Sequence, residues 1–513
     1  MQGRPGRRLI LGLAAAAITT RTGQAARAAT GADGPVRRTP AAGGLDVAAE
    51  NARPGSPDWR ITRAGPARAV EGFAERAAVR PGEPLGLRVS TTSASYTVSA
   101  YRMGWYRGAR ARLVWRSAPL PGVLQPPAAT DPATRMARAD WHRTAELDTS
   151  GWPEGSYLLR LDTTDGRAQR YVPVTLRSSS TAGRTVLVNA VATWQAYNRW
   201  GGADLYKGRT GTKASRSLQV SFDRPYSGRH GAGQFLVYEA PLVALAEELG
   251  LPLAYATGVD LAREPALLHG AAAVVSPGHD EYWSPEQRHH VTLARDAGTN
   301  LAVLGANCCY RRIRLEASPA GQDRVVVCYK DDYAEDPGYR RGFPPTHDFR
   351  RAPARDPESS LLGVIYDGYP VDAPYVVTHP GHWLLEGTGA RAGDAFAHLV
   401  GVEYDRVNPA HPTPRPIEVL AHSPVVRKGR ASYADTAYLS LPGGAAVFAT
   451  GTMRWVEALD AGGPVGRRGN HGLDARAAHF TRTVTANVLR AFARGPAGRA
   501  RPARDNLAAH YGA

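Results

Sequence analysis

The sequence is poor in cysteine. Among its 513 residues there are three, Cys308, Cys309 and Cys328, and an odd number this small permits at most one intrachain disulfide. A disulfide framework is therefore excluded, and hydrophobic cores must stabilise the fold. A chain of this length is sufficient for two or three domains, each with its own core.

Lysine is also scarce, because it accounts for only four of the 63 basic residues. The remaining basic residues are arginines scattered along the chain, and the formal net charge is +17 at pH 7. A surface that binds nucleic acid needs a concentrated basic stripe on a recognisable fold. The scattered charge therefore indicates a basic surface, and we expect no nucleic-acid partner.

The sequence lacks a hydrophobic run long enough to span a membrane as a helix. A short apolar run at residues 9–18 follows Arg7 and Arg8, and small residues at 25–29 offer a cleavage site. This order predicts an export signal over residues 1–30 that resembles a twin-arginine signal, with an ordinary secretory signal as the alternative. We therefore expect an exported protein in the periplasm, at the cell surface or outside the cell.

Two regions of different periodicity follow a linker. Residues 31–49 contain few large apolar side chains, which predicts a disordered linker. Residues 50–178 contain short segments of alternating polarity separated by turn residues, which predicts an immunoglobulin-like β-sandwich. We expect its strands at residues 85–89, 96–101, 157–161 and 171–176, with the last two paired.

Strand and helix patterns alternate over residues 184–494, which predicts an α/β domain with a mostly parallel sheet. Asp260 should cap a short helix within it. The polar segment 331–357 is expected to be a long loop without regular structure, and residues 495–513 a flexible tail. We expect strands at 186–191, 253–256, 271–275, 301–304, 325–329, 417–421 and 445–450, and helices at 240–249, 285–297 and 480–492.

One strand-loop-helix-strand unit, residues 271–310, has the clearest local signals. Ser284 is a good helix N-cap, Pro285 suits the first helical position, and Gln287 completes a capping box. The two strands should be parallel neighbours joined by a right-handed crossover. The loop before the helix then lies at the carboxyl end of the sheet, where ligand sites of open parallel sheets are found.

That loop contains His279, Asp280, Glu281 and Tyr282, four adjacent side chains that can bind a metal ion or transfer protons. His279 or Glu281 can act as a general base, because a partly buried cleft brings either pKa toward neutrality. We include Asp280 with them as a catalytic candidate. In the alternative interpretation, His279 and Asp280 cap the loop, and Tyr282 is a buried aromatic residue with a satisfied hydroxyl group.

Seven polar and aromatic stretches support a resemblance to a known family. They are YRMGWYRG at 101–108, TWQAYNRWGG at 193–202, SFDRPY at 221–226, GHDEYWS at 278–284, LGAN at 304–307, GVEYDR at 401–406 and LAHSP at 420–424. Together they resemble the N,N-dimethylformamidase large-subunit-like family over residues 50–455. The resemblance implies a class I glutamine-amidotransferase-like α/β fold without its cysteine triad. It also implies hydrolysis of the carbon–nitrogen bond of a small-molecule amide.

The resemblance further implies a mononuclear non-haem iron site, held by two tyrosinates and by one glutamate that follows a histidine by two residues. Carried over to this sequence, the ligands are Tyr282, Tyr238 and Glu358. The residue two positions after His347 is Phe349, so the histidine–glutamate pair is not reproduced there. A phenolate binds a hard trivalent cation well, and a bound metal lowers the pKa of coordinated water and polarises a carbonyl group.

Two other functions remain open. A cysteine hydrolase would use Cys308 at a helix N-terminus as its nucleophile, with His382 or His422 as its base. Bound metal distinguishes the iron hydrolase from the cysteine hydrolase and from a non-enzymatic binding protein. A homo-oligomer or a small partner subunit is compatible with all three functions. A secreted binding protein would hold a carbohydrate or another ligand on aromatic side chains of the β-sandwich, at Trp59, Tyr101, Trp105, Tyr106 and Trp152.

Overall fold

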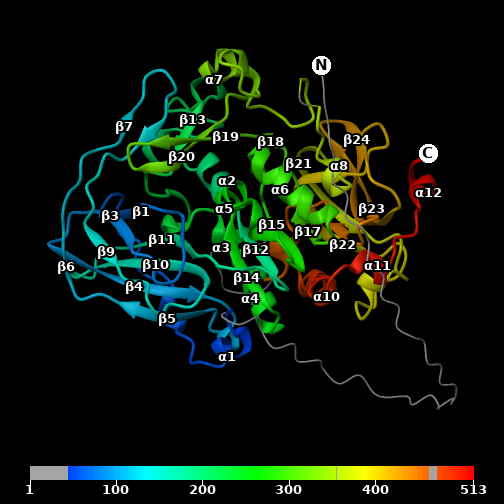
Figure 1. Cartoon of the computed structure of the whole chain (residues 1–513), viewed down its shortest axis with the longest axis horizontal. Helices are drawn as coiled ribbons and strands as arrows, with labels where there is room; N and C mark the ends of the chain where they lie inside the picture. The colour runs from blue at the N-terminus through cyan, green and yellow to red at the C-terminus, as the bar shows by residue number, and fades with distance from the viewer. Residues whose placement is uncertain (1–43, 354, 461–470, 513) are drawn as a thin grey trace, which may run out of the picture. The chain divides into compact units, whose positions relative to one another are not determined.

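The computed structural model describes residues 44–353, 355–460 and 471–512 (Figure 1). The predicted export signal lies outside these residues, as do residues 31–43 of the predicted linker. The described chain has a mixed α/β fold with several sheets. Within it, no helix has both the length and the apolar character that a membrane crossing requires.

The described residues before 178 form mainly antiparallel β-structure (Figure 1). They begin with helix α1 (Val47–Asn51), which starts inside the predicted linker. Apolar side chains of two sheets, such as Val89 and Leu159, share one core. One sheet has the order β1 (Val70–Ala74), β3 (Leu85–Thr91), β9 (Ala145–Leu147). The other has the order β2 (Ala78–Val79), β11 (Gln169–Leu176), β10 (Gly155–Thr163), β4 (Ser95–Met103), β5 (Ala111–Arg116), with β6 (Leu120–Pro121) beside β4.

The strands predicted in this region are present. β10 and β11 pair in antiparallel register, with Tyr157 opposite Val174, as their alternating polarity and the turn between them indicate. The short strand β2 is an exception, because it pairs with β11 in parallel. The small ribbon β7 (Ala129–Thr130) and β8 (Ala137–Arg138) lies outside both sheets.

The aromatic residues considered as a ligand platform are mostly core residues. Trp59, Tyr101, Tyr106 and Trp152 are all buried, and only Trp105 is partly exposed. A side chain packed into a core cannot stack on a sugar ring. The structure therefore does not favour the carbohydrate-binding alternative.

A seven-stranded sheet organises the rest of the chain. Its first five strands are parallel, the sixth runs antiparallel to them, and the seventh is antiparallel to the sixth, so the sheet is mostly parallel as predicted. The order is β14 (Leu253–Thr257), β12 (Thr185–Asn189), β15 (Ala273–Gly278), β17 (Asn300–Gly305), β25 (Ala446–Ala449), β24 (Arg430–Ser440), β23 (Ile417–Arg427).

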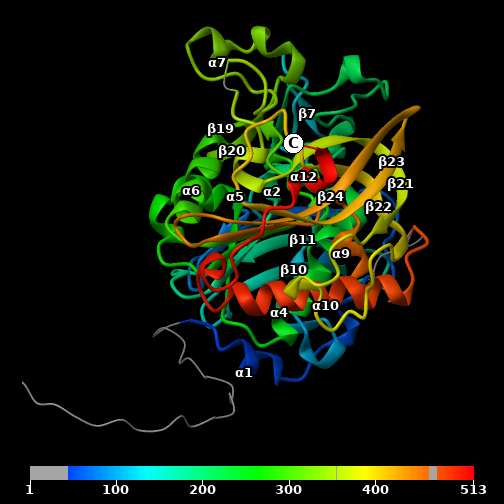
Figure 2. The ribbon, with the colours of Figure 1, turned by 90° about the vertical axis from the view of Figure 1, so that its right-hand side faces the viewer.

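Both faces of this sheet are buried, which explains why its central strands are apolar throughout. Successive residues of a strand point to opposite faces, so Val274 and Val275 belong to two different cores. Helices α4 (Ala240–Glu248) and α10 (Ala475–Phe492) pack on one face (Figure 2). Helices α5 (Gly258–Arg263) and α6 (Pro285–Asp296) pack on the other.

The helix caps agree with the sequence at α6 and differ at α5. The Ser284 hydroxyl group accepts a hydrogen bond from the Gln287 backbone amide at 3.2 Å, as predicted, but the described residues show no return bond from the Gln287 side chain, so the expected capping box is only half formed. Asp260 is not the cap of α5. Thr257 is the cap, and Asp260 is its capping-box partner at the third helical position, where its carboxylate accepts the Thr257 amide at 2.8 Å.

Several segments differ from the organisation predicted from the sequence. The strand expected at 325–329 is β20 (Gly321–Val327), which joins β13 (Gln219–Ser221) and β19 (Arg314–Ser318) in a separate sheet. The predicted loop 331–357 begins with two short helices, η7 (Lys330–Glu335) and α7 (Pro337–Arg340). Strands β21 (Ile365–Val376) and β22 (Ala395–Arg406) form a long ribbon, and β16 (Tyr282–Trp283) pairs with β18 (Arg311–Arg312).

The segment predicted to be a flexible tail instead packs against the sheet. It carries α11 (Ala497–Ala500) and α12 (Leu507–Tyr511), and Leu507 is buried. Asn506 accepts the Val419 amide of edge strand β23 at 2.7 Å, so the tail satisfies backbone groups that an edge strand leaves open. The other short helices are η1 (Pro57–Trp59), η2 (Tyr106–Gly108), α2 (Val191–Ala196), η3 (Trp200–Gly202), η4 (Lys213–Ser215), η5 (Gly228–Gly231), α3 (Phe235–Tyr238), η6 (Pro265–Leu268), α8 (Ser359–Leu362), η8 (Trp383–Leu385) and α9 (Trp455–Ala458).

Candidate active site

The predicted loop lies at the carboxyl end of the central strand β15. The strand ends at Gly278, whose φ of +48° and close approach to Tyr238 require glycine, since an added Cβ would lie 2.6 Å from the Tyr238 Cβ. His279, Asp280 and Glu281 follow at once and are buried. The sharp turn therefore places three titratable side chains together at the edge where ligand sites form.

The Glu281 carboxylate is the centre of this cluster. The Tyr197 hydroxyl group donates to its Oε2 at 2.6 Å, and the Tyr206 hydroxyl group donates to its Oε1 at 2.5 Å. The two phenol oxygens are 3.2 Å apart, and their rings stack with centroids 4.8 Å apart. His279 Nε2 lies 3.6 Å from Glu281 Oε2. Two phenols, one carboxylate and one imidazole therefore converge.

Nearby cations hold Glu281 ionised. Burial would raise its pKa, but His279 and the charges of Arg311 and Lys330 overcome that effect and lower the pKa to about 2. Arg311 Nε is 3.3 Å from Glu281 Oε1. Burial would likewise lower the pKa of His279, but Glu281 and Glu403 raise it above its ordinary value. The imidazole is thus poised to hold a proton beside a carboxylate.

Unlike Glu281, the two phenol groups of Tyr197 and Tyr206 are held in their neutral form. Burial and the negative charge of Glu281 raise the pKa of Tyr197 and of Tyr206 well above the ordinary tyrosine value. Both therefore donate as neutral hydroxyl groups. Burial lowers the pKa of Lys330 to about 7, and its Nζ lies 3.3 Å from the centroid of the Tyr206 ring.

Of the three predicted metal ligands, Tyr282 and Tyr238 border the cluster around Glu281, whereas Glu358 is paired with Arg350. The Tyr282 ring packs edge-on against the ring of Tyr206, 6.5 Å between centroids, while Tyr238 packs against His279 at 5.5 Å. Glu358 is engaged by Arg350, whose Nε donates to its carboxylate at 3.1 Å. The side chains that contact Glu281 are instead those of Tyr197, Tyr206, His279 and Arg311.

Asp280 also has a different setting from its neighbours. Its Oδ2 accepts a hydrogen bond from the Ser276 hydroxyl group at 3.0 Å, and its backbone carbonyl accepts the Cys309 amide. Burial raises the pKa of Asp280 to about 7. These contacts tie the loop that carries His279 and Glu281 to β15 and to the segment after β17.

Sequence reasoning missed Tyr197, Tyr206 and Glu403. Tyr197 follows helix α2 within the stretch TWQAYNRWGG, and Glu403 lies on β22 within GVEYDR. Asn307 Nδ2 donates to Glu403 at 2.7 Å. Both stretches were part of the evidence for the family resemblance, but the sequence analysis assigned no catalytic or metal-binding role to Tyr197 or Glu403. The histidine–glutamate pair sought near His347 is present instead at His279 and Glu281.

A cavity of about 230 Å³ adjoins the cluster. The Oε1 atom of Gln234, one of its lining residues, is 3.1 Å from His279 Nδ1, and the Tyr197 ring packs against the imidazole at 4.9 Å. The cavity thus ends on side chains that contact His279. Its lining residues are Trp194, Tyr197, Asn198, Tyr226, Gly228, Arg229, Gly233, Gln234, Val237 and Tyr238.

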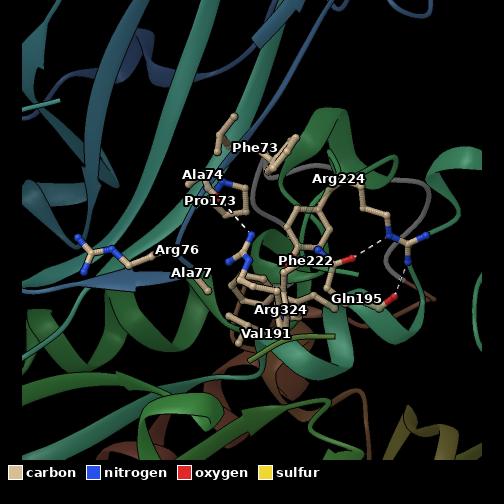
Figure 3. Close-up of a pocket in the computed structure, with 13 residues that line it drawn as sticks. Phe73, Ala74, Arg76, Ala77, Pro173, Val191, Gln195, Phe222, Arg224 and Arg324 are labelled. Carbon is tan, nitrogen blue, oxygen red and sulfur yellow. Dashed lines mark hydrogen bonds between the residues drawn. The ribbon is translucent and has the colours of Figure 1, made fainter. Parts of the chain in front are cut away.

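A second cavity, of about 20 Å³, lies where the N-terminal sheets meet α2 and β13 (Figure 3). Arg324 donates there to the Ala74 carbonyl group at 3.3 Å, and Arg224 donates to the Gln195 side chain at 3.2 Å. This volume is enough for about one water molecule. The larger cavity is therefore the candidate substrate site.

The cysteine alternative is not supported by the geometry. Burial raises the pKa of Cys308 well above its ordinary value and that of Cys309 to about 12, whereas a nucleophilic cysteine needs a lowered pKa. The two histidines considered as its base have carboxylate partners of their own. His382 Nε2 is 3.2 Å from Glu418, and His422 Nδ1 is 2.7 Å from Asp435.

The fold and the site together define an α/β protein with an acid–base cluster at the carboxyl end of its parallel strands. The family model described as N,N-dimethylformamidase beta subunit-like, C-terminal, matches residues 97–471. The chain belongs to this family, which confirms the resemblance drawn from the sequence and indicates a hydrolase of amides. Comparison with curated proteins gave no match.

Proposed function

We propose that the protein hydrolyses the carbon–nitrogen bond of an amide at the cluster around His279 and Glu281. In this reaction the oxygen of water forms a bond to the carbonyl carbon, the carbon–nitrogen bond breaks, and a proton passes to the leaving amine. The observation that carries the proposal is the convergence of Tyr197, Tyr206 and His279 on Glu281 beside a cavity.

We propose His279 as the residue that transfers the proton. Its Nδ1 is held by Gln234 at 3.1 Å, whereas its Nε2 is buried 3.6 Å from Glu281 Oε2, beyond hydrogen-bond distance. Nε2 can therefore take a proton from water and return one to the amine, which is general acid–base catalysis. Glu281, held ionised, stabilises the protonated imidazole.

Iron remains a proposal, and its ligand set needs revision. Among the described residues, no three His, Cys, Asp or Glu side chains come together as a metal site. A metal site in which two ligands are tyrosine phenolates needs only one ligand from among His, Cys, Asp and Glu. Tyr197, Tyr206 and Glu281 fit the two tyrosinates and one glutamate of the family pattern, and Glu281 follows His279 by two residues. Bound iron would supply Lewis acidity and lower the pKa of water.

Changing Tyr206 to Phe tests this ligand set. Tyr206→Phe should remove most of the iron from the purified protein and the visible tyrosinate-to-iron absorption band, because one donor oxygen is lost. Elemental analysis and a visible spectrum are the measurements. Tyr282→Phe is the matched control, because the revised ligand set does not include Tyr282 and this variant should therefore keep the iron. Loss of iron in Tyr282→Phe alone would restore the ligand set predicted from the sequence.

We also propose a specific fold for each of the two regions of the chain. We infer an immunoglobulin-like sandwich over residues 50–178 and a class I glutamine-amidotransferase-like domain over residues 184–494. The two antiparallel layers and the parallel centre of the seven-stranded sheet support this. We also propose assembly with a second copy or a small partner subunit, supported by the word subunit in the family description.

Export is likewise a proposal that rests on residues 1–30. If Arg7 and Arg8 form a twin-arginine signal, changing both to Lys should stop export of the folded protein and leave its synthesis intact, because that pathway reads the pair. Immunoblots of the exported and retained fractions measure this. Continued export of the double variant would indicate an ordinary secretory signal.

A further inference from the structure

The substrate cavity has more room than the smallest amides need. Its volume is about 230 Å³. A water molecule occupies about 30 Å³ in the liquid, so the cavity has the volume of roughly eight waters, and covalently bonded atoms pack more closely than separate waters do. A formamide that carries only methyl groups would leave much of the cavity empty, and unfilled apolar space forfeits van der Waals contacts.

The walls of the cavity favour a planar aromatic group. Trp194, Tyr197, Tyr226 and Tyr238 supply four aromatic side chains to its lining. Aromatic pairs in stacked or edge-to-face contact gain more than their buried area alone provides. A flat ring is therefore the occupant that these walls bind best.

The central wall residue is fixed in place. The Trp194 indole N–H donates to the buried Glu239 carboxylate at 2.7 Å, and the indole ring packs edge-on against Tyr226 with centroids 6.1 Å apart. Gly233, at a φ of +61°, brings backbone close to the Tyr226 ring and to the Trp194 Cβ. The aromatic wall thus exists before any ligand arrives, so a ligand would not have to order it.

Two polar residues of the lining, Gln234 and Tyr197, lie at the end near His279. Gln234 holds the imidazole, and Tyr197 donates to Glu281. Asn198 is occupied by structural contacts, because its Nδ2 donates to Gln195 and to Pro225. The amide of a substrate therefore belongs at the Gln234 and Tyr197 end, and an apolar substituent belongs against Trp194 and Tyr226.

We propose that the substrates are amides whose leaving amine carries an aromatic ring, bound against the wall formed by Trp194 and Tyr226 with the amide carbonyl group at His279. This inference rests on the proposed amide hydrolysis. It adds a substrate class that neither the family description nor the site chemistry specifies.

The test compares three formamides with the purified full-length protein. N-benzylformamide, N-(cyclohexylmethyl)formamide and N-methylformamide all release alkyl amines, so intrinsic reactivity is similar and the substituent is the variable. We expect kcat/KM for the benzyl compound to exceed that for the methyl compound by at least about tenfold, since apolar groups in a fitted pocket are worth about 10–200-fold. The cyclohexylmethyl compound should fall between them. Equal values for the benzyl and methyl compounds would overturn the inference.

A variant that fills the cavity provides a second readout. Val237 is a half-buried lining residue on α3 that contributes no polar group to the cluster. Val237→Phe should lower the ratio of kcat/KM for N-benzylformamide over N-methylformamide by about tenfold, because the added ring occupies the space of the substituent. An unchanged ratio in a folded variant contradicts the inference.

Binding separates failure of the inference from failure of the proposed function. If no formamide is hydrolysed, the proposed function fails. Calorimetric titration of the wild-type protein with N-benzylformamide and with N-methylformamide then decides the inference alone. Tighter binding of the benzyl compound supports the aromatic subsite, and equal or undetectable binding of both overturns it.

Discussion

Replacing His279 by Asn should reduce the rate of amide hydrolysis by about 10²–10⁴-fold, the usual contribution of a positioned general acid–base. Asn is polar and smaller than His, but it cannot carry a proton between water and the leaving amine. Release of amine from the best formamide substrate is the measurement. His289→Asn is the matched control, because His289 is exposed on α6 and outside the cluster. Its activity should stay within twofold of wild type.

The pH profile should carry the signature of the same residue. Glu281 and Glu403 raise the pKa of His279 above its ordinary value of about 6.5. Neutral imidazole, the form that accepts a proton, therefore becomes abundant only above that pH. We expect kcat/KM to rise with pH along a limb centred above pH 6.5, and this limb should be missing in His279→Asn. A limb that survives in the variant would have to be attributed to another group.

Replacing Glu247 by Ala should cost about 3–5 kcal/mol of unfolding free energy, the usual result of removing one partner of a buried ion pair. The side chains of Glu247 on α4 and Arg102 on β4 are both fully buried, with Nη2 2.5 Å from Oε1. Tyr255 on β14 and Asn51 on α1 also donate to Glu247. The variant leaves the Arg102 charge without its partner at the contact between the N-terminal sheets and the α/β region.

The neighbouring acid on the same helix is the control for this prediction. Glu248 pairs with Arg482 on α10, and both side chains are partly exposed to solvent. Exposed ion pairs contribute about 0–1 kcal/mol, so Glu248→Ala should have little effect. Equilibrium denaturation in urea compares the two variants. Equal destabilisation by both would show that the buried network does not stabilise the protein as described.

Local sequence signals predicted those parts of the fold that depend on neighbouring residues. The strands β15 and β17 and the Ser284 cap of α6 are each determined by a few adjacent residues. Each lies where the sequence predicted it. The tail after 494 was mispredicted because its stability comes from the contact of its residue Asn506 with the distant edge strand β23. Strand β20 was placed in the wrong sheet for the same reason, since its polarity does not specify its partner.

The site was predictable only in part for a related reason. The loop at 279–281 could be located because strand ends and their following residues are sequence neighbours. Tyr197 and Tyr206 reach Glu281 from a segment more than seventy residues earlier, and no spacing rule specifies that contact. Glu358 was chosen by its order in the chain, but Arg350 neutralises it in the fold. Convergence in space, which order in the chain does not reveal, decides which carboxylate belongs to the site.

The central claim is that water cleaves an amide at the cluster around Glu281. Its most direct test is turnover of a formamide by the purified protein in ¹⁸O-labelled water, with mass spectrometry of the formate and assay of the amine. The account predicts one labelled oxygen in the formate, one amine released for each formate, and loss of both products in His279→Asn. Absence of turnover by the iron-replete protein, or turnover that is retained in His279→Asn, would contradict it.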